Sequence, residues 1–220
     1  KPLIAASMFG NTTPAVDRAK ETMEEHGYEV LVFHATGTGG RTMEALIEDG
    51  YIDGVLDITT TEWADEVCGG VLSAGPTRLE AAAKTGTPQV VVPGCIDMAN
   101  FWAIETVPEK YQDRNLYKWN PNVTLMRTNV DENAEMGLMF AERLNQATGP
   151  VAVFVPLKGV SMLDSAGEPF WNPEADQAFL ETLKQNLREG IPVYELEYNI
   201  NDPEFVDAVS SQLLEFLGRA

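Results

Sequence analysis

The residues with the clearest potential for chemistry lie in a glycine-rich turn, HATGTGGR, which runs from His34 to Arg41. An alternating apolar segment, residues 28–33, precedes the turn, and a helical pattern follows from Arg41 onward. The turn contains three glycines, Gly37, Gly39 and Gly40. Glycine permits positive φ and close approach of a ligand, and the start of the next helix offers unpaired N–H groups to an anion. This pattern predicts a site for a small polar or anionic molecule. A plain tight connection is the alternative, because the spacing matches no nucleotide-binding motif.

Polar turns of the same kind follow four other predicted strands. Because the carboxyl ends of parallel strands share one edge of a sheet, we expect these turns to converge on one crevice. Hydroxyl groups and helix N-termini would donate hydrogen bonds there, and Lys158 and Arg41 would supply positive charge. The predicted ligand-binding residues are Asn11, Thr12, Thr13, Thr36, Gly37, Thr38, Gly39, Gly40, Arg41, Thr60, Glu62, Gly94, Asn100, Lys158, Gly159 and Ser161.

Four residues at these strand ends could instead be catalytic, as in a hydrolase or lyase. His34 could act as a general base near neutral pH, and Cys95 could act as a nucleophile. Asp57 and Asp97 could exchange protons, or join His34 and Glu62 around a divalent metal, but no close ligand spacing supports a metal site and none is predicted. Backbone hydrogen bonding for the aspartates and inert packing for the cysteine are the structural alternatives.

Residues 106–122 form an irregular excursion rich in Pro, Tyr, Lys and Trp. Loops longer than about 12 to 15 residues in compact domains are usually functional or disordered, which favours a lid. Its aromatic side chains, with Phe101 and Trp102 just before it, could cover a ligand or could bury against a neighbouring subunit or domain.

Strand and helix patterns alternate along the whole chain. The predicted strands cover residues 3–8, 28–33, 54–58, 89–93, 150–156 and 193–198. One strong helix, over residues 131–148, is predicted to bury a face that contains Ala134, Leu138, Ala141 and Leu144. The alternation is typical of a doubly wound, mostly parallel six-stranded α/β sheet of Rossmann-like type, with helices on both faces. We interpret residues 1–220 as a single α/β domain.

The composition restricts the partners. The chain has 34 acidic and 15 basic residues, and a net charge of −19 would repel nucleic-acid phosphates, so no direct nucleic-acid binding is expected. No apolar segment approaches the length of about 20 residues that spans a bilayer, which predicts a soluble protein without membrane contact. The two cysteines, Cys68 and Cys95, fit neither a disulfide framework nor a zinc motif, and a reducing cytoplasm is the expected location.

Four separated segments resemble the UPF0261 family, also called Tm-1-like proteins. They are HATGTGGRTMEALI (residues 34–47), DITTTE (57–62), GCIDMANFW (94–102) and PLKGVSMLDSAGEPFWNPEAD (156–176). The resemblance covers essentially the whole chain and is to the carboxyl-terminal half of the family's proteins. It implies an amino-terminal Rossmann-like domain as a partner, a homodimer, and association of some members with a TIM-barrel protein. It also implies ATP as a cofactor, bound through the amino-terminal half, whose DTKGEE-like opening this chain lacks.

The leading hypothesis is a small-molecule-binding domain that holds an anionic metabolite or nucleotide at the carboxyl edge of the sheet. A metabolic enzyme that uses His34, Asp57, Asp97 or Cys95 is one alternative, and a structural dimerisation domain is another.

Overall fold

The computed structural model describes residues 1–218 and contains a main sheet of six strands and a second sheet of three. The main strands lie in the order β2-β1-β3-β4-β8-β9, and every neighbouring pair is parallel. Their bounds are β1 Leu3–Met8, β2 Glu29–His34, β3 Gly54–Thr59, β4 Gln89–Gly94, β8 Val151–Pro156 and β9 Val193–Leu196. This parallel sheet confirms the predicted α/β fold class.

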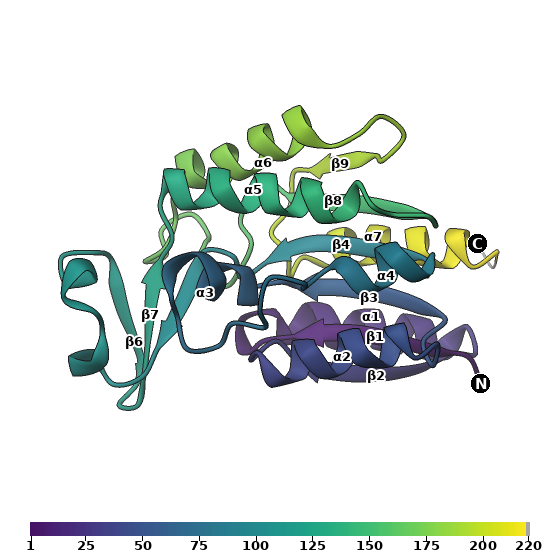
Figure 1. Cartoon of the computed structure of the whole chain (residues 1–220), viewed down its shortest axis with the longest axis horizontal. Coiled ribbons are helices and arrows are strands. Elements are labelled where there is room, and N and C mark those ends of the chain that lie inside the picture. Colours follow the sequence, from purple (N-terminus) through teal and green to yellow (C-terminus); the bar gives the residue numbers. More distant parts are fainter. Residues whose placement is uncertain (219–220) are drawn as a thin grey trace.

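Helices cover both faces of the main sheet (Figure 1). The side chains of β4 alternate between the two faces: Val90 and Val92 pack with α1 and α7, whereas Val91 packs on the opposite face with α3, α5 and α6. The helix bounds are α1 Thr13–Glu25, α2 Thr38–Glu48, α3 Glu62–Cys68, α4 Glu80–Thr85, α5 Val130–Leu144, α6 Pro173–Asn186 and α7 Pro203–Phe216. Within residues 1–218, none of the helices combines the length and the apolar character that crossing a membrane requires.

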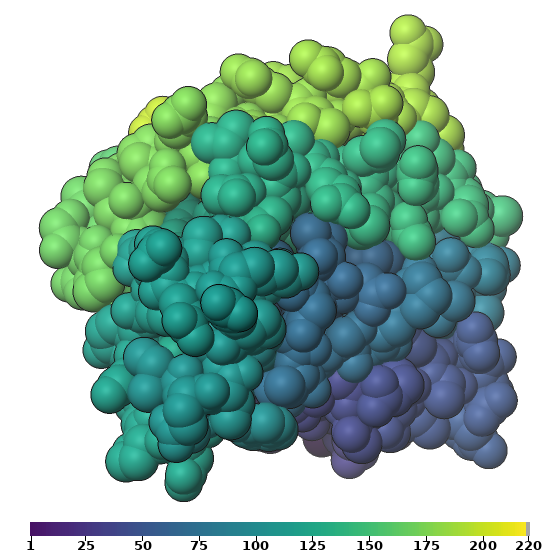
Figure 2. Space-filling view, turned by 60° about the vertical axis from the view of Figure 1, so that its left-hand side comes forward, coloured from purple at the N-terminus to yellow at the C-terminus, as the bar shows by residue number. Residues whose placement is uncertain are grey.

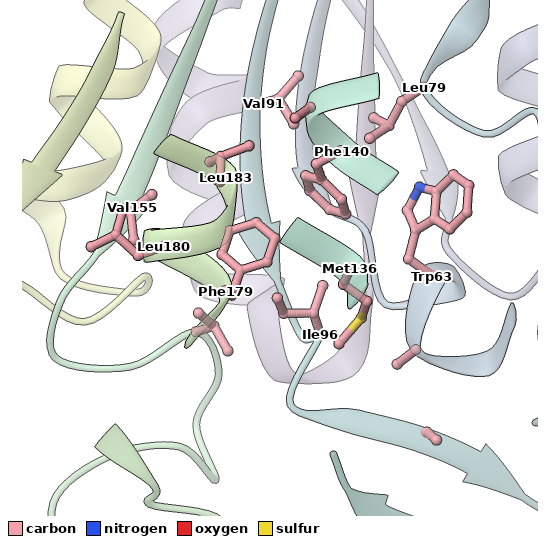
Figure 3. Close-up of a cluster of buried hydrophobic side chains, with 14 of the residues drawn as sticks. Trp63, Leu79, Val91, Ile96, Met136, Phe140, Val155, Phe179, Leu180 and Leu183 are labelled. Carbon is pink, nitrogen blue, oxygen red and sulfur yellow. The ribbon is translucent and has the colours of Figure 1, made fainter. Parts of the chain in front are cut away.

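The largest core cluster is organised around Phe140 of α5 (Figure 3). Its ring centroid lies 6.5 Å from that of Trp63 in α3 and 5.0 Å from that of Phe179 in α6. Met136 and Phe140 are fully buried, whereas Leu138 is 38% exposed. The predicted buried face of this helix was therefore wrong at Leu138, because the residues that face α6 and the sheet are centred on Met136 and Phe140.

The three-stranded sheet stands beyond the carboxyl ends of the main strands (Figure 1). It is antiparallel, with the order β5-β7-β6, and its strands are β5 Met98–Phe101, β6 Leu116–Asn120 and β7 Val123–Arg127. The excursion predicted to be irregular thus contains one regular strand, β6, after the single 3-10 turns η2 (Ile104–Thr106) and η3 (Glu109–Tyr111). A Pro-Asn turn joins β6 to β7, where the N–H of Asn122 donates a 2.8 Å hydrogen bond to the side chain of Asn120.

Candidate functional site

A cavity of about 610 Å³ opens between the carboxyl edge of the main sheet and the three-stranded sheet. In Figure 2 the teal surface of the three-stranded sheet adjoins the blue surface of the α3 and α4 region at this end of the molecule. The residues that line the cavity are Phe9, Gly10, Asn11, Thr36, Thr38, Val71, Leu72, Asn100, Phe101, Trp102, Trp119, Asn120, Val123 and Leu125. None of these side chains is charged, although the chain as a whole carries a net charge of −19.

Helix α2 begins at Thr38, three residues earlier than the sequence pattern predicted. Thr38, Gly39 and Gly40 form its first turn, where the backbone N–H groups have no intrahelical partner. Gly37, just before the helix, has φ 87° and ψ −66°, which residues with a side chain rarely adopt. Because Thr38 lines the cavity, this end of α2 offers backbone donors and the positive end of the helix dipole to a ligand.

The glycines of this turn permit three close approaches between segments. A Cβ atom on Gly37 would lie 2.7 Å from the carbonyl oxygen of Ser73, in the loop between α3 and α4. A Cβ on Gly39 would overlap the carbonyl of His34, and one on Gly40 would overlap the carboxylate of Glu62. Other segments of the protein therefore pack tightly against one side of the turn, and its other side faces the cavity.

A buried ionic cluster centred on Arg78 supports the floor of the site. The Arg78 guanidinium donates to both oxygens of Asp57, at 2.5 and 2.7 Å, and to Glu62 at 2.8 Å. Asp57 also accepts a 2.7 Å bond from the Ser7 hydroxyl at the end of β1. Glu62 accepts a 2.7 Å bond from the backbone N–H of Gly37. The cluster thus connects the ends of β1 and β3 to the N-terminus of α2.

The carboxylates of this cluster outnumber its cation. Glu44 of α2 accepts a hydrogen bond from the N–H of Leu79 and lies 3.8 Å from the Arg78 guanidinium, so two buried carboxylates and this partly buried one share one arginine. Desolvation by burial raises the pKa of Glu44 to about 7, against the opposing attraction of Arg78. Desolvation also raises the pKa of Glu62, again opposed by Arg78 and by the bond from Gly37.

Asn100 and Asn11 bring amide groups to the cavity wall. Asp65 of α3 accepts bonds from the backbone and side-chain N–H groups of Asn100, at 2.6 and 2.8 Å, and so holds β5 against α3. The N–H of Val71 donates to the Asn100 carbonyl at 2.9 Å, which closes the wall. The side-chain oxygens of Asn100 and Asn11 are both buried without a hydrogen-bond partner. Such groups are costly to leave unpaired, and both residues line the cavity.

Two half-exposed tryptophans flank the cavity. Trp102 follows β5 and is 51% exposed, and Trp119 lies in β6 and is 47% exposed. The Trp119 ring approaches the turn after β1, because a Cβ on Gly10 would lie 3.7 Å from its Cζ2 atom. Aromatic faces of this kind bind flat or apolar groups, while the amides and hydroxyls deeper in the wall bind polar ones.

The structure brings some of the predicted ligand-binding residues together and separates others. Asn11, Thr36, Thr38 and Asn100 line the cavity. A second group supports the turns around it without lining it, and consists of Thr12, Thr13, Gly37, Gly39, Gly40, Arg41, Thr60, Glu62 and Gly94. Lys158, Gly159 and Ser161 follow β8, which β3 and β4 separate from β1. Three strand spacings amount to about 14 Å, so these residues belong to a different cluster.

The cluster that contains Ser161 is buried and centred on the Ser161 hydroxyl. The Ser161 hydroxyl donates to Asp97 at 2.7 Å and accepts from the N–H groups of Leu163 and Asp164, both at 3.1 Å. Arg127 lies 3.2 Å from Asp164, and burial raises the pKa of Asp164 to about 9 and that of Asp97 to about 6. Lys158 is exposed beside this cluster. These contacts tie the loops after β4 and β8 together.

The predicted catalytic residues do not share one open site. His34 is exposed at the end of β2, and β1 and β3 lie between that strand and β4, which precedes Cys95. Asp57 is paired with Arg78, and Asp97 is fully buried. Cys95 is also fully buried, and desolvation raises the pKa of its thiol well above the usual value, which opposes nucleophilic chemistry. Among residues 1–218, no group of three or more His, Cys, Asp and Glu side chains could hold a metal ion.

Sequence reasoning missed Arg78 and Asp65, the residues that position the site. The available signal was Asp57, an aspartate within an apolar strand, because such a residue needs a cation or several donors nearby. Choosing Arg78 from the 15 basic residues required the fold, which places the turn before α4 against the end of β3.

Comparison with known proteins gave consistent matches over nearly the whole chain. The model of the "Uncharacterised protein family (UPF0261) C-terminal domain" matches residues 1–217. A UPF0261 protein of Clostridium tetani is 57% identical over 218 residues, which are 99% of this chain and 54% of that protein. The ToMV resistance protein Tm-1(GCR237) of Solanum lycopersicum is 45% identical over 96% of this chain and 28% of its own length. The chain thus spans about half the length of the bacterial relative, and less of the plant one.

Proposed function

The chain belongs to the UPF0261 family, as its C-terminal domain, and from this premise we propose that it binds a small molecule in the cavity at the carboxyl edge of the sheet. The family name assigns no activity, so the proposal depends on the cavity. Its main support is the combination of two buried, unpaired amide oxygens, at Asn11 and Asn100, with the free donors at the start of α2.

The chemistry of the walls restricts the ligand. The α2 N-terminus calls for a hydrogen-bond acceptor or a negative group, and the two amide oxygens call for a donor such as a hydroxyl or an amide. The aromatic and aliphatic walls, with Trp102 and Trp119 at the mouth, favour a flat or apolar body. A metabolite that carries a carboxylate or carboxamide beside a hydroxyl or amine, on an apolar body, satisfies all three requirements.

A paired substitution on α2 tests this assignment. Thr38 and Thr42 are both exposed threonines on α2, but only Thr38 lines the cavity. Flat carboxylates, carboxamides and hydroxy acids would be screened by thermal shift and by quenching of tryptophan fluorescence. We expect ligands that stabilise the wild type and Thr42→Val, with at least about 5-fold weaker affinity for Thr38→Val, the equivalent of losing one hydrogen bond.

Trp119 provides a second, independent test. Trp119→Ala should weaken the same ligands, whereas Tyr51→Ala, which removes a 62% exposed aromatic ring outside the cavity lining, should not. Ligands that bind all four variants with wild-type affinity would show that the binding site lies elsewhere on the protein. A screen that gives no stabilising compound of these classes would contradict the proposed function.

A further inference from the structure

Glu62 occupies the protein side of the same helix end that faces the cavity. Its carboxylate accepts the 2.7 Å bond from the N–H of Gly37 and lies directly against Gly40, where a Cβ atom would overlap it. The positive end of the α2 dipole amounts to about half an elementary charge. A buried carboxylate in this position already neutralises much of it, before any ligand enters.

Within residues 1–218, no positively charged side chain lines the cavity to offset the charge of Glu62. The Arg78 guanidinium is 1% exposed and donates its hydrogen bonds to Glu62, Asp57 and the carbonyl of Thr59. No lysine or arginine is among the lining residues. Arg41 keeps its charge but does not line the cavity, and its guanidinium donates to the carbonyl of Ser73. A doubly negative group would therefore meet a neutral wall, a capped helix and a protein of net charge −19.

We propose that Glu62 sets the charge that the cavity accepts, so that the ligand carries an uncharged or singly negative head group and doubly negative phosphate monoesters are excluded. This inference rests on the proposed function, because it concerns the same cavity. It makes Glu62 a residue that determines specificity through the α2 N-terminus, since its side chain does not line the cavity.

The test uses three probes with one flat body and different charges: naphthamide, naphthoate and naphthyl phosphate. Dissociation constants would be measured by calorimetry at about pH 8, where the phosphate is doubly charged, and at constant ionic strength. We expect the wild type to bind naphthamide and naphthoate, and to bind naphthyl phosphate at least about 10-fold more weakly than naphthoate. Equal or tighter binding of the phosphate to the wild type would overturn the role of Glu62.

Two glutamine variants locate the effect. Glu62→Gln and Glu44→Gln each remove one carboxylate from the Arg78 cluster, but only Glu62 bonds to Gly37. Glu62→Gln should reduce the ratio of the naphthyl phosphate and naphthoate dissociation constants by about 10-fold. Glu44→Gln should leave this ratio unchanged. An equal change in both variants would show a general effect of net charge and would contradict the inference.

The outcomes separate the two proposals. If none of the three probes binds the wild type, the proposed function fails, and the inference fails with it. If the probes bind and Thr38→Val weakens their binding, but Glu62→Gln does not change the ratio of the naphthyl phosphate and naphthoate dissociation constants, only the inference fails. If circular dichroism shows that Glu62→Gln does not fold, equal or tighter binding of naphthyl phosphate than of naphthoate to the wild type still overturns the inference.

Discussion

The backbone N–H of Gly37 donates a 2.7 Å hydrogen bond to the carboxylate of Glu62, 25 positions further along the chain. This bond joins the turn after β2 to the first residue of α3, and Arg78 extends it to Asp57 in β3. One side of the glycine-rich turn therefore faces the cavity, and its other side packs against a buried ionic cluster.

Gly37→Ala should destabilise the protein more than Gly50→Ala. Both glycines have positive φ, 87° and 79°, so both substitutions cost about 1 to 2 kcal/mol in backbone strain. Only at Gly37 would the new Cβ also crowd a backbone atom, the Ser73 carbonyl oxygen, whereas nothing lies within 4 Å of a Cβ at Gly50. We expect Gly37→Ala to lower the free energy of unfolding by at least about 1 kcal/mol more, measured by urea denaturation. Equal losses would mean that the loop after α3 moves away without cost.

Arg78→Met should lower the free energy of unfolding by about 3 to 5 kcal/mol, because it leaves the buried carboxylates of Asp57 and Glu62 without their cation. Arg18→Met is the matched control, since Arg18 makes a comparable pair with Asp207 on the surface. Exposed pairs contribute little, so this variant should unfold close to the wild type. The comparison uses urea denaturation of both variants, and similar midpoints would contradict the structural role given to Arg78.

Glu44→Gln should reduce the dependence of stability on pH. The pKa of Glu44 is raised to about 7 in the folded protein, whereas an unfolded glutamate titrates near about 4.3. Between these values the folded state binds more protons than the unfolded state, so the free energy of unfolding falls as pH rises through this window. The variant lacks this contribution, and its slope should be smaller by up to about 1.4 kcal/mol per pH unit. Parallel curves for wild type and variant, from urea denaturation across the window, would disprove the assignment.

The native protein should be inert to thiol reagents. Cys68 and Cys95 are 3% and 0% exposed, and desolvation raises the pKa of both thiols. Since the thiolate is the reactive form, neither should react with Ellman's reagent faster than the protein unfolds, while both should react in denaturant. Rapid reaction of Cys95 in the native state would restore it as a candidate nucleophile, and rapid reaction of Cys68 would contradict its burial.

Local patterns in the sequence were enough to predict the main sheet, but not the three-stranded sheet. The alternation of apolar strands with helices predicted the parallel sheet, and the strand before His34 and the helix after Gly40 were recognised from residues within one or two turns of each other. Errors followed where a local pattern had two interpretations. The glycines after Gly37 were interpreted as loop although a first helical turn accommodates them. β6 lacked a clear alternation because none of its residues is buried.

The positions of the polar turns were predictable, but their grouping was not. Strand order decides which turns are neighbours, and the order β2-β1-β3-β4-β8-β9 places Asn11 and Thr36 beside one cavity while it moves Ser161 three strands away. Asn100 joins the cavity only because β5 packs on α3 through Asp65.

The sequence by itself determined the fold class, the family and the edge of the sheet where polar groups collect, because these depend on periodicity and on short segments. Only the tertiary structure shows that Arg78 pairs with Asp57 and Glu62, and that Glu62 accepts the N–H of Gly37 at the start of α2. Such pairings depend on the direction in which side chains leave elements distant in sequence, and a buried charge constrains only the presence of a partner, not its identity.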